Sequence, residues 1–307
     1  MPPVSTARMP RILDHLRARG LSASAARDAL STGKVYYRGV PTGDGGREST
    51  PDEVELRPTA PRLVPGRDLV ILHKDEALVV VVKPSGLLSV PAPRAGGGHS
   101  ALSVVSQILG GPALPVHRLD EDTSGLLLIA RTPTAQLALK ADFEAHTIER
   151  RYHAVVAGPA PEVPFSIHSL LVRDRGDGRR GSAPPDAPAP PDARPALTHV
   201  RRLATFPRGV ALVEATLETG RTHQVRIHLA ERGLPLVGDP LYAPPGVARR
   251  GPRLGLHAAV LGFRQPATGV FLRFEAPLAD DLTVFLRGLS HEAPPPARGA
   301  ARPRRRG

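Results

Sequence analysis

VHRLDEDTSGLLLIART, residues 116–132, joins a charged turn directly to an apolar segment. Gly125 closes the turn, and the unbroken apolar run from Leu126 to Ile129 predicts a strand buried inside a sheet. Asp120 lies at the mouth of this strand, and a carboxylate placed there is a candidate nucleophile. More often, however, an isolated aspartate in a loop only forms part of an acidic turn before a strand. The rest of the chain has to decide between these two interpretations.

The composition limits the classes of protein to consider. With 307 residues, 41% of them hydrophobic, the chain can form one large domain and a small accessory one. A net charge of +12 and a pI of about 11.0 favour a polyanionic partner, nucleic acid first. The absence of cysteine excludes disulfides, thiolate nucleophiles and Cys-ligated zinc. No apolar run suits a membrane span or a signal peptide, so we expect a cytoplasmic protein. A monomer is also expected.

Residues 1–62 are expected to form a small α/β module. Ile12, Leu13 and Leu16 have helical spacing, and Ser22 is suited to cap a second helix. Residues 34–37 and 54–56 have the composition of short strands.

The same module carries a concentration of positive charge. Between positions 8 and 38 there are seven basic residues against two acids. Such a cluster is typical of a surface that contacts phosphates, and Arg11, Arg27 and Lys34 are therefore candidate RNA ligands. The alternative is that two helix faces simply carry solvated charges.

A proline-rich linker at residues 58–67 separates this module from a second domain at 63–290. Strands are expected at 69–72 and 77–82, and the latter leads into Lys83, which is placed to hold a phosphate or pair with an acid. Thr132 is expected to cap a helix that ends near His146. Further strands are expected at 152–156, 167–172, 211–217 and 270–274.

Two segments lack the apolar residues needed for a packed structure. Residues 174–196 contain six prolines and three glycines and no large apolar side chain, which predicts a disordered insertion. Residues 291–307 are expected to form a basic, disordered tail.

A junction between a strand and a helix at residues 219–228 carries Arg221 and Arg226. Thr222 is suited to cap this helix and Gly233 to end it. Two arginines beside a helix N-terminus predict an anion site. His223 and His228 are five residues apart and do not share a helix face, so we expect no metal site.

Several blocks of sequence, in this order, resemble the RluA-type family of RNA pseudouridine synthases. They are Lys83-Pro84-Ser85-Gly86, His117 to Gly125, Tyr152, Thr219 to His228, Gly238-Asp239-Pro240-Leu241-Tyr242 and Leu256-His257-Ala258. The resemblance spans most of residues 69–286. Arg11 to Leu16, Leu21-Ser22, Gly33 to Val35 and Asp52 to Glu55 similarly resemble the alpha-L RNA-binding motif.

The resemblance implies an α+β fold: a mixed, mostly antiparallel central sheet, flanked by helices, with a catalytic cleft. It implies that Asp120 is the nucleophile, that Tyr152 is its aromatic partner and that Arg226 pairs with the aspartate. On residue type alone, a strand tyrosine is more often a packing residue. Candidate substrate-binding residues are His117, Arg118, Arg221 and Lys83.

The implied reaction converts uridine in RNA to pseudouridine. Because the reaction is an isomerisation, no cofactor is expected. A neighbouring arginine would favour the ionised carboxylate and fix its orientation. Large-subunit rRNA is the expected substrate, with tRNA as the alternative and a non-catalytic RNA-binding protein as a third interpretation. A protein kinase is excluded, since the aspartate after His117-Arg118 comes one residue late and no Gly-rich loop is present.

Overall fold

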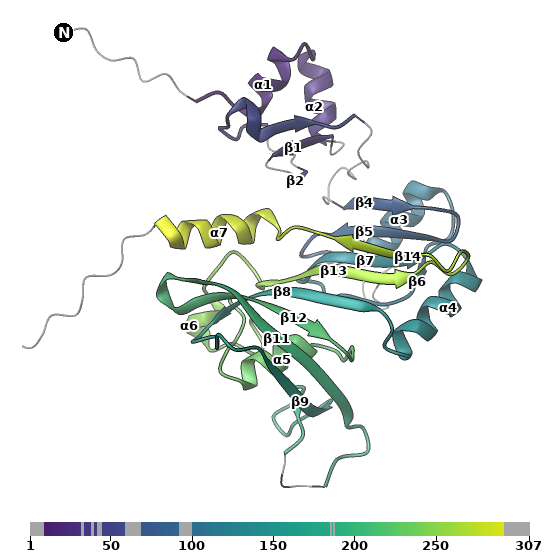
Figure 1. Ribbon diagram of the computed structural model, residues 1–307, viewed down its shortest axis with the longest axis vertical. Helices are drawn as coiled ribbons and strands as arrows, with labels where there is room; N and C mark the ends of the chain where they lie inside the picture. The colour runs from purple at the N-terminus through teal and green to yellow at the C-terminus, as the bar shows by residue number, and fades with distance from the viewer. Residues whose placement is uncertain are drawn as a thin grey trace, which may run out of the picture.

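The computed structural model describes residues 9–31, 34–37, 40–41, 45–58, 69–91, 100–184, 186 and 188–291 (Figure 1). Nearly all of the predicted linker, and the predicted tail after His291, lie outside these residues. The strands form a three-stranded sheet near the N-terminus and an eleven-stranded sheet in the rest of the chain.

The N-terminal module has the predicted order of two helices followed by a small sheet. Its elements are α1 (Ile12–Ala18), α2 (Ala23–Ser31), β1 (Val35–Tyr37), β2 (Val40–Pro41), the 3-10 helix η1 (Pro51–Glu53) and β3 (Val54–Leu56). The Ser22 hydroxyl accepts a hydrogen bond from the backbone N–H of Ala25 at 3.1 Å, as expected of a cap. A separate hydrophobic cluster, including Ile12, Leu16 and Val35, lies between the helices and the sheet.

The large sheet has the strand order β10-β9-β11-β12-β8-β13-β7-β5-β4, with β14 paired to β13 and β6 to β7. The bounds are β4 (Val70–Lys74), β5 (Leu78–Lys83), β6 (Leu114–Pro115), β7 (Ser124–Ala130), β8 (Glu149–Ala157), β9 (Phe165–Val172), β10 (Gly181–Ser182), β11 (Arg194–Phe206), β12 (Val210–Leu217), β13 (Leu256–Arg264) and β14 (Phe271–Glu275). Among the paired strands described, only β7 and β13 run parallel. The predicted mixed, mostly antiparallel α+β fold is therefore confirmed.

The large sheet is flanked by helices. They are α3 (Ala101–Leu109), α4 (Pro133–Glu144), α5 (Gln224–Glu231), α6 (Pro245–Ala248) and α7 (Asp280–His291), with the 3-10 helix η3 at Pro207–Gly209. Helices α3 and α4 cover the two faces of the sheet at β7. Successive strand side chains point to opposite faces. Leu127 and Ile129 therefore pack in the cluster that contains α3, whereas Leu126 and Leu128 pack in the one that contains α4. This explains why the run is apolar without alternation.

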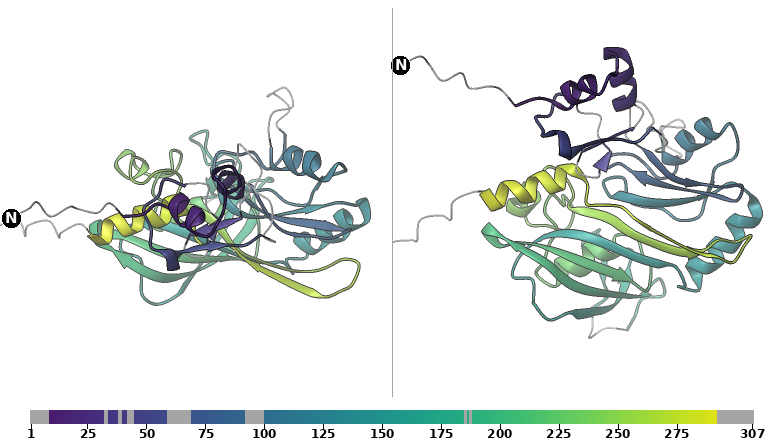
Figure 2. Two further views of the ribbon diagram at one scale, coloured as in Figure 1. Left: turned by 90° about the horizontal axis from the view of Figure 1, so that it is seen from above. Right: turned by 45° about the horizontal axis from the view of Figure 1, so that its top comes forward.

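The N-terminal module lies beside α7, as both views in Figure 2 show. The Arg47 guanidinium and the Asp280 carboxylate, 3.7 Å apart, link the module to the first turn of that helix.

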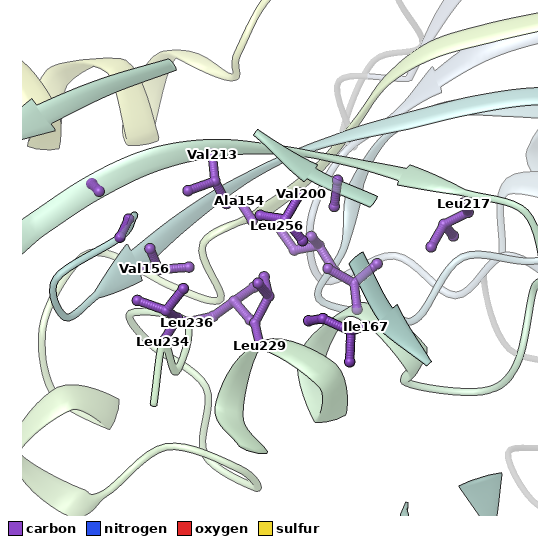
Figure 3. Close-up of a cluster of buried hydrophobic side chains, with 14 of the residues drawn as sticks. Ala154, Val156, Ile167, Val200, Val213, Leu217, Leu229, Leu234, Leu236 and Leu256 are labelled. Carbon is purple, nitrogen blue, oxygen red and sulfur yellow. The ribbon is translucent and has the colours of Figure 1, made fainter. Parts of the chain in front are cut away.

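Helix α5 is seated on β8, β11 and β12 by a fourth hydrophobic cluster (Figure 3). Leu229 of α5 is completely buried among Ala154, Val200 and Val213. This packing fixes the helix that carries Arg226 against the sheet.

The prediction that residues 174–196 are disordered is wrong for all but positions 185 and 187, which are not described. The segment contains β10, which pairs with β9, and the first residues of β11. Hydrogen bonds replace hydrophobic burial here, since the Asp174 carboxylate accepts from the N–H groups of Gly176 and Gly178. The Glu231 carboxylate on α5 accepts from both the N–H and the hydroxyl of Ser182.

Gly125, near the start of β7, lies where β7 closely approaches β13, and a substitution there tests this contact. Its φ is +114°, and a Cβ added there would lie 2.2 Å from the carbonyl oxygen of Ala258. Because a backbone atom cannot move away as a side chain can, we expect Gly125→Ala to lower the free energy of unfolding by about 4 kcal/mol or more. Gly110→Ala, which also has a positive φ but faces open space, should cost about 1–2 kcal/mol. Chemical denaturation of both variants measures the difference, and equal losses would contradict the assigned close approach.

Candidate active site

Lys83 fastens the loop that carries Asp120. Its ammonium group is fully buried and donates hydrogen bonds to the carbonyls of Pro84 at 2.8 Å, Leu87 at 2.7 Å and Glu121 at 2.9 Å. Burial lowers the pKa of Lys83 to about 7. The prediction that Lys83 contacts RNA is therefore wrong: its polar group is used inside the protein and is not available to a phosphate.

Two serines of the same segment complete this attachment. The Ser85 hydroxyl donates to the carbonyl of Asp122 at 2.7 Å. The Ser89 hydroxyl donates to the carbonyl of Leu119 at 2.8 Å and accepts from its N–H at 3.0 Å. The backbone on both sides of Asp120 is thus fixed to residues 83–89, while the Asp120 side chain remains 23% exposed.

Arg226 lies between two carboxylates. Its Nη1 is 3.4 Å from Oδ2 of Asp120, as the resemblance implied. Its Nε and Nη2 each donate to Asp239 at 2.8 Å, a bidentate pair in which Asp239 is completely buried. Asp239 in turn accepts from the N–H groups of Leu241 and Tyr242. The shorter, bidentate bonds show that Asp239 orients the guanidinium, which presents its remaining side to Asp120.

The charges of this pair stabilise each other. Burial alone would lower the pKa of Arg226, but the hydrogen bonds and charge of Asp239 raise it above its ordinary value. Burial alone would raise the pKa of Asp239, but Arg226 and two backbone N–H groups lower it. Both groups are therefore charged at neutral pH, and a fixed positive charge faces Asp120.

Tyr152 lies in the middle of β8, where it pairs with Ala215 on one side and Ala258 on the other. The sequence had suggested that it begins the strand. Tyr152 packs against two hydrophobic clusters, the one that contains α5 and the one that contains α3. It also lines the same cavity as Asp120. Burial raises the pKa of the Tyr152 hydroxyl to about 12, and the negative charge of Asp120 acts in the same direction. The hydroxyl is thus protonated at neutral pH.

His223 is the N-cap of α5, so the prediction that Thr222 caps this helix is wrong. His223 has φ +60°, a left-handed conformation that costs energy for any residue other than glycine. Its Nδ1 is 2.8 Å from the Tyr242 hydroxyl, and its Nε2 is 3.8 Å from Oδ2 of Asp120. Burial lowers its pKa, which the Asp120 charge offsets only in part. The predicted helix end at Gly233, φ +71°, is confirmed.

These side chains line a cavity of about 190 Å³. Asp120, Tyr152, His223 and Arg226 all contribute to its wall, together with Arg118 and Arg221. Its volume is below the roughly 300–1,000 Å³ typical of sites for drug-sized ligands, which suits a single heterocyclic ring. Arg118 is exposed at its rim.

His117 does not line this cavity, and the structure contradicts its prediction as an RNA ligand. Its ring stacks on Phe143 with centroids 4.6 Å apart, and its Nε2 accepts from the N–H of Leu128 at 2.9 Å. Burial lowers the pKa of His117 to about 3, so the ring is neutral and can accept that bond. His117 therefore supports β7 from the side.

The remaining predicted RNA ligands lie in the N-terminal module and do not line the catalytic cavity. Arg11 is the N-cap of α1, Arg27 is exposed on α2, and Lys34 directly precedes β1. A separate depression beside α1 includes Arg11 in its wall.

Sequence reasoning missed two parts of the site. Asp239 was named within a block of the family resemblance but given no role in the site, and His223 was considered only as a metal ligand. The signal for Asp239 was its place in one of the blocks that carry the family resemblance. Across the described ranges, no group of three or more His, Asp or Glu side chains is placed to hold a metal ion. Nor does any helix there combine the length and apolar character that crossing a membrane requires.

Buried neutral histidines predict a loss of stability in mild acid. Burial lowers the pKa of His117 and His257 to about 3 and that of His228 to about 4. Because the folded pKa values are depressed, their stabilising effect is complete above about pH 6.5 and is lost as the pH falls toward the folded values. As the pH falls from 6 to 4, each ring should lower the free energy of unfolding by up to about 1.4 kcal/mol per pH unit.

Urea denaturation of wild type and His117→Gln at pH 6, 5 and 4 measures this contribution. The free energy of unfolding of the variant should fall less steeply with decreasing pH than that of wild type, by up to about 1.4 kcal/mol per pH unit, the effect of one proton. His168→Gln, at an exposed position, is the matched control and should follow wild type. Parallel pH profiles for all three proteins would contradict the lowered pKa of His117.

A loop aspartate tethered to a buried arginine, beside a strand tyrosine on a mostly antiparallel sheet, is the constellation of an RNA pseudouridine synthase. Comparison with known proteins agrees. A family model described as RNA pseudouridylate synthase matches residues 77–231. A solved structure, human RNA Pseudouridylate Synthase Domain Containing 1, has the same fold, with a TM-score of 0.59 at 22% identity over 76% of this chain and 99% of that one.

Relatives in bacteria are more similar in sequence. An uncharacterized RNA pseudouridine synthase of Chloroflexus aurantiacus is 42% identical over 69% of this chain and 66% of its own length. The dual-specificity RNA pseudouridine synthase RluA of Pasteurella multocida is 39% identical over 69% and 94%. Ribosomal large subunit pseudouridine synthase D of Zymomonas mobilis is 35% identical over 72% and 73%. The chain belongs to the RluA-type family of RNA pseudouridine synthases, which are isomerases acting on RNA.

Proposed function

We propose that this protein isomerises specific uridines of large-subunit rRNA and that Asp120 is the nucleophile. The observation that carries the assignment of Asp120 is its position: its carboxylate is partly exposed in a cavity, 3.4 Å from a buried arginine that a second carboxylate orients. Asp122 and Glu121, its acidic neighbours, are exposed and do not line that cavity.

The reaction breaks the bond from ribose C1′ to N1 of uracil and forms a bond from C1′ to C5. C5 loses a proton and N1 gains one, so the atoms balance without a cofactor. The base has to detach, turn and reattach without leaving the site. The carboxylate can act by attack on the base or by removal of a ribose proton, and both routes start from ionised Asp120. Arg226 favours that form and fixes its direction.

Tyr152 gives the detached base a surface to stack on. Its hydroxyl, with a pKa of about 12, is a poor base at neutral pH unless its own proton is passed on. The nearby Asp120 carboxylate is the acceptor for such a transfer once it has completed its first task. Tyr152 therefore serves as a stacking surface first, and as a proton carrier only together with Asp120.

The target nucleotide must leave its stack to enter a cavity of this size, which costs a few kcal/mol. Arg118 at the rim and Arg221 in the wall offer charge to phosphates on either side of it. Large-subunit rRNA is proposed because relatives carry that name, and tRNA is the second candidate because the Pasteurella relative is called dual-specificity.

Purified protein incubated with unmodified 23S rRNA and, separately, with unmodified tRNA tests the substrate. Pseudouridines are then mapped by carbodiimide labelling and primer extension. We expect product at defined positions of the rRNA. Product in tRNA alone would overturn the rRNA assignment while leaving the enzyme class intact.

The N-terminal module is expected to add RNA affinity. Its excess of basic residues, Arg11, Arg27 and Lys34 among them, attracts phosphates, and its separate core means that it can be removed as a unit. Deleting residues 1–62 should raise the Kd for substrate RNA and flatten the plot of log Kd against log salt. Fluorescence anisotropy at 50–200 mM salt measures both, and an unchanged slope would refute the role.

A further inference from the structure

A second cavity, of about 270 Å³, adjoins the catalytic one. The two share Gly220, Arg221 and Thr222 in their walls. Ile227 of α5 also lines it, and the rest of its wall comes from the end of β9, the start of β11 and the segment between them, which includes β10. This segment is the one whose composition predicted disorder.

The wall of this second cavity concentrates positive charge. Four arginines line it, namely Arg173, Arg180, Arg194 and Arg221. Within the described residues, none of the four forms an ion pair with a carboxylate. The one acid in the wall, Asp192, accepts a hydrogen bond from the backbone N–H of Arg173 at 3.0 Å. Four guanidinium groups around one space repel each other, and an anion bound between them offsets this repulsion.

The positions of these arginines are fixed by the fold. Ser182 of β10 is bonded to Glu231 of α5, which holds the segment next to Arg180 against the catalytic helix. Arg194 donates to the carbonyls of Pro191 and Ala193, and Arg221 donates to that of Pro195. These bonds use part of each guanidinium and leave further N–H groups for a ligand.

We propose that this second cavity binds the phosphates of the RNA strand that adjoins the target uridine. The inference rests on the proposed function and adds to it a defined path for the RNA. Guanidinium groups bind phosphate oxygens in pairs, and a row of them suits successive phosphates of one strand. Arg173, directly after β9, and Arg194, at the start of β11, are exposed. The RNA strand can therefore continue from the cavity toward solvent along these two residues.

The junction of the two cavities supports a polymer over a free anion. Gly220 to Thr222 belong to the walls of both cavities, so a nucleotide bound in the catalytic cavity can extend into the second one along these residues. Arg180 is close enough for its charge to act on His223 and Tyr242 of the catalytic site. A strand leaving the target ribose through this junction therefore meets Arg221 and Arg180 first.

A triple variant, Arg173→Gln with Arg180→Gln and Arg194→Gln, tests the path. Its control is Arg201→Gln with Arg264→Gln and Arg287→Gln, which removes the same charge from exposed positions outside both cavities. Binding of a fluorescein-labelled RNA stem-loop with uridines in the loop is measured by anisotropy at 50 and 200 mM salt. All proteins carry Asp120→Asn, so that no turnover intervenes.

The three contacts together should contribute about 2 to the slope of log Kd against log salt. Between 50 and 200 mM salt, the affinity of the test variant should consequently fall about 15–20-fold less than that of the parent. The control should retain the parent's slope. Equal slopes for the test and control variants would overturn the proposal, as would an unchanged Kd in the test variant.

A second measurement locates the strand without removing any arginine. Because the chain has no cysteine, Ala193→Cys introduces a single thiol beside the second cavity, and Val270→Cys introduces one on the exposed β13–β14 turn. Iron–EDTA attached at position 193 should cleave bound RNA next to the nucleotide that enters the active site, whereas position 270 should not. Cleavage from both or from neither position would count against the path.

Failure of this proposal and failure of the proposed function give different results. If wild type forms no pseudouridine in any RNA, the function falls, whatever the binding data show. If pseudouridine forms but the salt slopes of the test and control variants agree, the function stands and only the RNA path is wrong.

Discussion

Replacing Asp120 by asparagine is expected to reduce pseudouridine formation by about 10⁴-fold or more, because the amide cannot supply the carboxylate that both possible routes require. RNA binding should persist, since Asp120 contributes no positive charge to the surface. Release of tritium from [5-³H]uridine-labelled RNA measures turnover, and anisotropy measures binding in the same preparation. Glu121→Gln, a change at an exposed neighbour, should keep wild-type turnover.

The Asp120 variant should also remain folded. Its side chain is partly exposed, and its contact with Arg226 is longer than those Arg226 makes with Asp239. The backbone around it is fixed by Lys83, Ser85 and Ser89 independently of the carboxylate. Retention of turnover in a folded Asp120→Asn protein would sink the assignment of the nucleophile.

Asp239→Asn is expected to have the largest effect on stability in the site. Asp239 is completely buried and forms two 2.8 Å hydrogen bonds with Arg226, so removing its charge leaves a buried guanidinium without its main counter-charge. Breaking such a pair costs about 3–5 kcal/mol. Activity should also fall, because Arg226 is then free to turn away from Asp120. Urea denaturation measures the loss in free energy of unfolding. Asp122→Asn, at an exposed turn position, is the control and should lose little stability.

The effect of Asp239→Asn should depend on pH in one direction. The pKa of Asp239 is lowered in the folded protein, so its stabilising effect is fully present above the unfolded value of about 3.8 and is lost as the pH falls through the folded value. The stability difference between wild type and variant should therefore be constant from pH 5 to 7 and shrink below about pH 4. A difference that shrank between pH 7 and 5 would argue against this ion pair as its source.

Local patterns predicted much of the fold. The run Leu126–Ile129 indicated a buried strand, and the Thr132 hydroxyl does accept from the N–H of Ala135 to cap α4. Such features depend on neighbours along the chain. Residues 174–196 were predicted wrongly because their order comes from hydrogen bonds to Glu231 and to β9, which composition does not reveal.

The site could be predicted only as far as the family resemblance carried it. Arg226 and Tyr152 lie 106 and 32 residues from Asp120, and no local periodicity relates them. Lys83 and His117 were predicted as RNA ligands because a charged or titratable side chain in a motif suggests contact with substrate. Their side chains instead bond to the backbone of the Asp120 loop and of β7, contacts that arise only in the folded protein.

The parallel pairing of β7 with β13 has a consequence for how the enzyme is made. Ser124, at the start of β7, is bonded to His257 and to Arg253, which lie about 130 residues later in the chain. During synthesis, β7 therefore leaves the ribosome well before its parallel neighbour β13 exists. We expect the chain to become a catalyst only after β13 has joined the sheet, although its basic N-terminal module can attract RNA earlier. A chain that stops short of β13 should thus occupy RNA without modifying it.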